Sequence, residues 1–190
     1  MSKATCSLIA VSIVATLTIN CTGGRKSASA YLKYAMKSED NGDLEEAISL
    51  YTEALAIDSL LIKAYIRRGH TYDKLGDPER AMLDYDEVLK IDPDNARAYF
   101  HRGFSHLVAR EDGETDPAGA VREFTKAVEL GLDNAKVYYF RADARKRVGD
   151  LEGALLDYKK YMFRSRDEDK RSVQRAREEI RELEKALEDQ

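Results

Sequence analysis

Three histidines, His70, His101 and His106, are the first residues whose chemistry can be judged from their spacing. A zinc site takes imidazole, thiolate or carboxylate ligands, and two histidines that bind one ion from one helix face stand four residues apart. His101 and His106 are five residues apart, and no acid or thiol completes a ligand set around them. We therefore expect no metal at these histidines.

The acidic stretch EDGETD, from Glu111 to Asp116, is a second candidate for a metal site. With Glu123 its acids approximate the spacing of a calcium loop, but Pro117 stands where such a loop needs glycine for its sharp turn. No nucleophile and base pair, glycine-rich phosphate loop or acid and base dyad stands out elsewhere. The sequence therefore predicts no catalytic residues, no metal and no cofactor, and a protein that is not an enzyme.

An arginine recurs behind a tyrosine in the phrases YIRRG, YFHRG and YYFRA, as Arg68, Arg102 and Arg141. A guanidinium group binds a carboxylate or phosphate through two parallel hydrogen bonds. The recurrence therefore suits either a binding site or a structural ion pair. The elements that carry the arginines decide between the two.

Four similar units emerge when the Gly-Asp pairs at 42–43, 76–77 and 149–150 are aligned. Three units have 34 residues, and the third has 39 because five residues are inserted at its internal turn. The units cover residues 28–61, 62–95, 96–134 and 135–168.

The units share residue types at fixed positions. An aromatic residue early in the first helix is followed by a small one: Tyr31, Tyr65, Tyr99 and Tyr138, then Ala35, Gly69, Gly103 and Ala142. In the second helix an alanine is followed four residues later by an aromatic residue on the same face: Ala47, Ala81, Ala120 and Ala154, then Tyr51, Tyr85, Phe124 and Tyr158. An aspartate stands as helix N-cap before each second helix: Asp43, Asp77, Asp116 and Asp150. This pattern resembles the tetratricopeptide repeat family.

The resemblance implies an all-α fold, a right-handed α-solenoid of four helical hairpins over residues 28–168. Residues 169–190 are expected to form a C-terminal capping helix, because stacked repeats need a polar end. Its apolar stripe consists of Val173, Ala176, Ile180, Leu183 and Leu187. The same spacing also suits a short coiled-coil seam, although two heptads are marginal alone.

The recurring arginine occupies position 7 of repeats 2, 3 and 4, which faces the companion helix in this family. Position 23 of the same repeats holds an acid: Asp84, Glu123 and Asp157. Repeat 1 has neither charge, since Tyr34 and Leu50 stand there. We therefore predict structural ion pairs between the two helices of each hairpin.

The resemblance also implies that ligands bind on the concave side of the first helices. Cations and a histidine stand there beside aromatic residues: Lys63, Arg67, Arg97, His101 and Lys136, with Phe100, Phe104 and Tyr139. Cations that orient carboxylates, next to aromatic pockets that supply burial, suit an extended peptide or protein tail that carries acids. The asparagines of the family's carboxylate clamp are absent, so recognition of a C-terminal carboxylate is not predicted. The alternative is that these cations form only a solvated face.

The first 21 residues have the pattern of an export signal. Residues 8–19 form an uncharged apolar run, and Cys21 follows it closely, which resembles the lipid-modified cysteine of bacterial lipoproteins. Lipidation at Cys21, an uncleaved membrane anchor and plain secretion remain open, because 21 residues also suffice to span a bilayer. Residues 22–27, with Gly23 and Gly24, are expected to form a flexible tether.

The leading hypothesis is a non-catalytic scaffold that binds a protein or peptide partner. We expect it in the cell envelope, attached to the membrane through its N-terminus, with the repeats outside the cytoplasm. The alternative is a self-assembling structural or carrier protein that forms homo-oligomers or delivers a small anionic ligand to a transport system. A formal net charge of −4 predicts no nucleic-acid partner.

Overall fold

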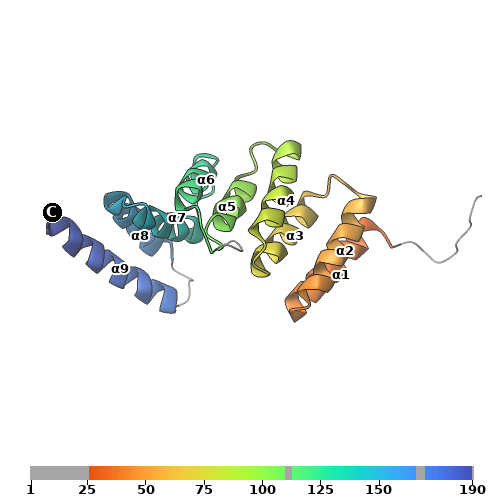
Figure 1. Ribbon diagram of the computed structural model, residues 1–190, viewed down its shortest axis with the longest axis horizontal. Helices are drawn as coiled ribbons and strands as arrows, with labels where there is room; N and C mark the ends of the chain where they lie inside the picture. Colours follow the sequence, from red (N-terminus) through yellow and green to blue (C-terminus); the bar gives the residue numbers. More distant parts are fainter. Residues whose placement is uncertain (1–25, 110–112, 166–169, 190) are drawn as a thin grey trace, which may run out of the picture.

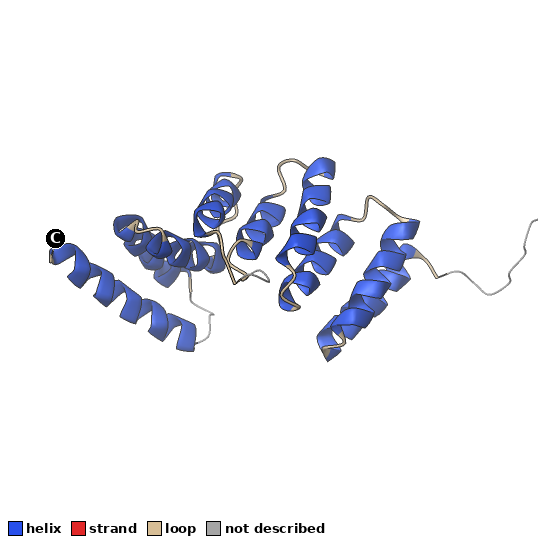
Figure 2. Ribbon diagram, in the orientation of Figure 1, coloured by secondary structure: helices blue, strands red, loops and turns tan. Residues whose placement is uncertain are grey.

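The structure is a computed structural model that describes residues 26–109, 113–165 and 170–189. These residues form helices joined by turns and contain no strand (Figure 2). The proposed signal, Cys21 and most of the tether lie outside the described residues, as do the first two acids of the EDGETD stretch.

Helices follow one another as hairpins along the long axis of the molecule (Figure 1). The first two hairpins are α1 (Ala28–Asn41) with α2 (Leu44–Ile57) and α3 (Ile62–Lys74) with α4 (Pro78–Ile91). The next two are α5 (Ala96–Ser105) with α6 (Pro117–Glu129) and α7 (Ala135–Arg147) with α8 (Leu151–Arg164). A single helix, α9 (Lys170–Glu188), follows them. The prediction of an all-α solenoid with a final capping helix is confirmed.

Glycine sets the turn inside three of the hairpins. Gly42, Gly76 and Gly149 have φ of 88°, 75° and 85°, a left-handed conformation that costs other residues energy. The next residue caps the second helix: Asp77 accepts a hydrogen bond from the amide of Arg80, and Asp150 accepts one from that of Gly153. Asp43 was expected to do the same, but its side chain makes no capping hydrogen bond.

The small residues of the first helices allow close approach of an aromatic ring. A Cβ atom added at Gly69 would lie 2.7 Å from the ring of Tyr85, and one added at Gly103 would lie 2.8 Å from that of Phe124. Real Cβ atoms do not approach a ring so closely, so repeats 2 and 3 require glycine at this position. The ring takes the space that a side chain would need.

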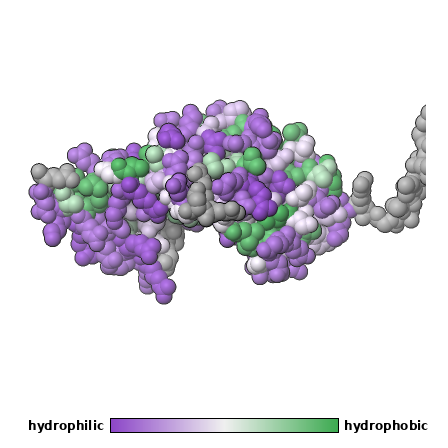
Figure 3. All heavy atoms as spheres, in the orientation of Figure 1, coloured by the Kyte–Doolittle hydropathy of each residue, from purple (hydrophilic) through white to green (hydrophobic). Residues whose placement is uncertain are grey.

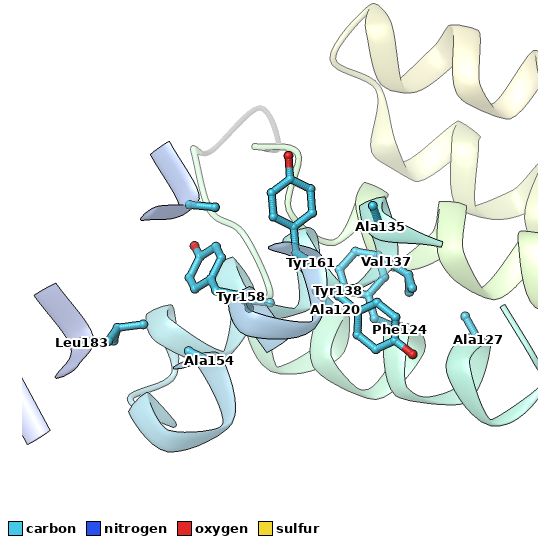
Figure 4. Close-up of a cluster of buried hydrophobic side chains, with 13 residues drawn as sticks. Ala120, Phe124, Ala127, Ala135, Val137, Tyr138, Ala154, Tyr158, Tyr161 and Leu183 are labelled. Carbon is cyan, nitrogen blue, oxygen red and sulfur yellow. The ribbon is translucent and has the colours of Figure 1, made fainter. Parts of the chain in front are cut away.

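Buried apolar residues form two separate clusters in the described part of the chain. The larger joins α6, α7 and α8 to α9, with Phe124, Tyr138 and Tyr158 among its members (Figure 4). The smaller joins α1, α2 and the start of α3 around Tyr51. The smaller cluster therefore joins repeat 1 to the start of repeat 2, and the larger joins repeats 3 and 4 to α9.

The final helix covers the end of the larger cluster. Ala176 and Leu183 are buried against α8, and Lys159 of α8 pairs with Glu184 at 2.8 Å. Most other α9 side chains are charged, and this end of the molecule is predominantly hydrophilic (Figure 3). The apolar stripe of α9 thus serves within the chain as a cap. Over the described ranges, no helix has the length and apolar character needed to cross a membrane.

Candidate binding groove

The recurring arginines lie between the two helices of their hairpins. Arg68 donates two hydrogen bonds to Asp84, at 2.9 and 2.7 Å, and Arg141 donates two to Asp157, at 2.7 and 2.8 Å. Arg102 binds both carboxylate oxygens of Glu123 in the same way. The prediction of structural ion pairs is confirmed.

Each of these arginines also contacts the preceding repeat. The third nitrogen of Arg68 donates to the Thr52 hydroxyl at 2.8 Å, and that of Arg102 donates to Asp86 at 2.7 Å. Arg141 has a longer contact with Thr125, at 3.4 Å. One side chain thus joins three helices, and each of its three nitrogens already has a partner within the chain.

Two cavities lie along the first helices of the hairpins, and residues of α3, α5 and α7 form most of their lining. We call the first the cationic cavity: it has a volume of about 610 Å³ and includes Lys63, Arg67, Arg97 and His101. We call the second the aromatic cavity: it has a volume of about 460 Å³ and includes Phe100, Phe104, Lys136 and Tyr139. His70 and His101 line both, so the two cavities adjoin each other, and we call the pair the groove.

The structure therefore places all eight residues expected at a peptide site along this groove. It adds residues that the sequence argument did not include. Ile62 and Asn95 line the cationic cavity, and Phe140, Tyr161 and Ser172 line the aromatic one. Tyr161 comes from a second helix and Ser172 from α9, so neither belongs to the face from which the prediction was made. A signal for Tyr161 existed, because the other repeats carry Ala54, Val88 and Ala127 at its position.

The cations of the groove differ in how they are paired. Lys63, Arg97 and Lys136 have no ion-pair partner among the residues that the structure describes. Arg67 lies 3.5 Å from the carboxylate of Glu39 on α1. Three positive charges of the groove are thus available to a ligand, and the fourth is partly compensated within the chain.

Glu39 is a buried carboxylate with partners from two helices. Its side chain is 2% exposed, and it accepts hydrogen bonds from the Tyr51 hydroxyl and the Lys74 ammonium, both at 2.8 Å. His70 lies 3.3 Å from it. Burial alone would raise the pKa of Glu39, but hydrogen bonds from His70, Lys74 and Tyr51 together lower it far below its usual range. Glu39 therefore stays charged and draws α3 toward α1.

Asp73 occupies the same position one repeat later without such partners. It accepts a hydrogen bond from Tyr85 at 2.9 Å, but its other carboxylate oxygen is buried with no hydrogen-bond partner. The residues that correspond to Arg67, His70 and Lys74 are His101, Phe104 and Val108. Burial accordingly raises the pKa of Asp73 to about 6.

His101 separates the two cavities as a neutral ring. It stacks on Tyr85 at a centroid distance of 5.6 Å and lies 5.8 Å from the ring of His70. Burial lowers the pKa of His101 to about 4, and the charges of His70, Arg67 and Arg97 act in the same direction. At neutral pH the His101 ring is therefore uncharged.

Asp73 and His101 should influence acid stability in opposite directions. Between pH 4 and 6.5 the unfolded chain binds more protons at His101 than the folded chain does, so this group makes stability rise with pH. Between pH 3.8 and 6 the folded chain binds more protons at Asp73, so this group makes stability fall with pH.

Asp73→Asn should therefore steepen the rise of Tm with pH over this range. Thermal unfolding by circular dichroism at several pH values measures it, and an unchanged slope would contradict the assignment.

Two of the three histidines lie near each other: the ring centroids of His70 and His101 are 5.8 Å apart. His106 lies 3.2 Å from a carboxylate oxygen of Asp116. In the described part of the chain no group of three histidine, cysteine, aspartate or glutamate side chains is placed to hold a metal ion.

Comparison with known sequences identifies the repeat in the first half of the fold. Profiles of the tetratricopeptide repeat match residues 28–59 and 62–95. These segments contain α1 with α2 and α3 with α4. A comparison with curated protein sequences finds no match.

Solved structures of similar shape cover most of the chain. A crystal structure of MamA aligns with a TM-score of 0.67 and 22% identity, over 80% of this chain and 84% of that one. MamA from Desulfovibrio magneticus RS-1, from residue 41 to its end, aligns with a TM-score of 0.64 and 21% identity, over 75% and 78%. The first tetratricopeptide repeat domain of Spaghetti (RPAP3), bound to the HSP90 peptide SRMEEVD, aligns with a TM-score of 0.59 and 18% identity, over 65% and 94%. At these identities the likeness establishes the fold.

Proposed function

We propose that this chain is a non-catalytic scaffold whose groove binds an extended acidic segment of a partner protein. One observation carries the proposal: the groove contains three cations that form no ion pair with any residue that the structure describes, and no carboxylate is among the described residues that line either cavity. An unpaired cation beside apolar surface gains most from a ligand carboxylate, because the surrounding side chains exclude water.

A neighbouring fold supports this choice of ligand. The peptide bound by the Spaghetti (RPAP3) domain, SRMEEVD, contains two glutamates and an aspartate. The present chain would hold its acids through Lys63, Arg97 and Lys136 rather than through asparagines. Asn95, which lines the cationic cavity, is already occupied, since it caps α5 at Ala98 and donates to Asp92.

Reversal of one groove charge tests the proposal. Arg97→Glu should weaken binding of a fluorescent peptide with four glutamates by about tenfold or more, because an attractive contact becomes repulsive. The fold should survive, since an exposed cation contributes little to stability. Fluorescence anisotropy at 50 and 500 mM salt measures both the affinity and its decrease with ionic strength.

Arg177→Glu is the matched control, because Arg177 is an exposed arginine of α9 that does not line either cavity. It should leave affinity unchanged. Equal effects of the two reversals would contradict a specific site. Light scattering that shows an oligomer dissociated by Arg97→Glu would instead favour the self-assembling alternative.

We further propose that residues 1–20 act as an export signal that is removed, and that lipid on Cys21 then tethers the repeats to a membrane. The support is the apolar run that ends just before this cysteine. Cys21→Ala should move the protein from the detergent phase to the aqueous phase in detergent partitioning, or leave an unprocessed precursor. Mass spectrometry of the native chain provides the check: a chain that still begins before residue 21 would contradict lipidation.

A further inference from the structure

The aromatic cavity differs in chemistry from the rest of the groove. Seven of its nine lining side chains carry aromatic rings, counting two imidazoles. They come from α3, α5, α7 and α8, and α9 closes the end with Ser172. The rings contact one another edge-on, as Phe104 does with Phe140 and Tyr139 with Tyr161. This cavity presents ring edges and faces, where the cationic cavity presents charges.

An aromatic-lined site suits either a cation or another apolar ring. Electrostatics disfavours the cation here. Lys136 lines the cavity, and no carboxylate among the described lining residues offsets its charge. The remaining ligand is an uncharged ring or a ring with an anionic neighbour.

The size and position of the aromatic cavity further limit the ligands that it could bind. A volume of about 460 Å³ lies near the lower end of small-molecule pockets, roughly 300 to 1,000 Å³. It has room for one aromatic side chain and a few waters. His70 and His101 line both cavities and lie between them. A bound peptide that passes over these two histidines would place its acids in the cationic cavity and a neighbouring side chain in the aromatic cavity.

We propose that the aromatic cavity is the pocket for one aromatic side chain of the partner, carried by the same acidic segment that lies over the cationic cavity. The inference rests on the proposed function and adds its specificity: charge brings acidic segments to the groove, and the ring selects among them. Lys136 holds an acid next to the ring.

Peptide binding to the full-length chain tests the inference. One probe is a fluorescent peptide with four glutamates and a short glycine and serine extension. The others form a series in which each peptide carries one phenylalanine, placed at a different position of a glycine and serine extension. The extension precedes the acids in some peptides of the series and follows them in the others. At the best position phenylalanine should tighten binding by about tenfold, because burial of a ring contributes about 1.5 kcal/mol or more.

Phe104→Ala should abolish this gain, so that the variant binds the phenylalanine peptides and the purely acidic peptide with similar affinity. The matched control is Met36→Ala, since Met36 holds the same repeat position in α1 and lies outside the aromatic cavity. Should Phe104→Ala fail to fold, as circular dichroism would show, Phe104→Trp offers a second route, because it fills the cavity and should also abolish the gain.

The outcomes separate the two proposals. If neither peptide binds, the proposed function fails and this inference fails with it. If the acidic peptide binds but phenylalanine adds nothing at any position, or its gain survives both Phe104 variants, only the aromatic pocket is wrong. Tighter binding of a peptide with trimethyllysine in place of phenylalanine would show a cation site and overturn the inference too.

Discussion

Asp157→Ala is expected to destabilise the protein by about 3 to 5 kcal/mol, because it leaves a buried guanidinium without its anion. The Asp157 side chain is fully buried and that of Arg141 is 7% exposed. Asp157 also accepts a hydrogen bond from Arg145 at 2.8 Å, so a second cation loses one of its contacts. A loss of this size should lower Tm by on the order of 10 °C, measured by circular dichroism or calorimetry.

The double variant Arg141→Met with Asp157→Leu is the control for this prediction. Removing both charges and keeping the volume should recover most of the loss, since a buried ion pair and an apolar pair of similar size are often equally stable. Arg102→Ala should cost less than Asp157→Ala, about 2 to 4 kcal/mol, because Arg102 and Glu123 are 21% and 16% exposed. A wild-type Tm for Asp157→Ala would overturn the structural role of these pairs.

Glu39→Ala should have the next largest effect, a loss of about 2 to 4 kcal/mol. The Tyr51 hydroxyl would remain buried without its acceptor, which alone costs about 1 to 3 kcal/mol. Arg67 and Lys74 would also face each other without the anion between them. The free energy of unfolding in urea measures the loss.

Two further variants separate these contributions. Glu39→Gln keeps an acceptor for Tyr51 and removes only the charge, so its effect should be intermediate. Glu45→Ala is the matched control: this exposed acid of α2 should change stability by less than about 0.5 kcal/mol. If Glu39→Ala behaves like Glu45→Ala, the carboxylate does not join α1 to α3.

Features that recur in several repeats could be predicted from the sequence, because the same residue type at the same position of several repeats indicates a shared structural role. The arginine at position 7 and the acid at position 23 appear together in three repeats and are absent together from the first. Their ion pair follows from this covariation and the hairpin geometry. The glycine turns at Gly42, Gly76 and Gly149 were found in the same way, and the structure shows why glycine is required there.

Features that occur once could not be predicted in this way. Glu39 binds partners from the next repeat, but the corresponding residues later in the chain are Asp73, Leu107 and Lys146. No repetition marks it, and a contact between residues 28 apart leaves no local pattern. The partial pairing of Arg67 was missed for the same reason. Tyr161 and Ser172 reach the groove from helices whose equivalents elsewhere do not line it.

The division of the buried residues into two clusters has a consequence for how the groove opens. Repeat arrays unfold in steps when neighbouring units are coupled unequally. The cluster around Tyr51 holds α1, α2 and the start of α3, and the larger cluster backs the aromatic cavity. Fraying from the N-terminal end would therefore remove Lys63 and Arg67 from the groove and leave Phe104 and Tyr139 in place. Arg97 lies on α5, whose Phe100 and Phe104 pack against the larger cluster, so one cation of the cationic cavity would stay with the aromatic cavity when Lys63 and Arg67 detach.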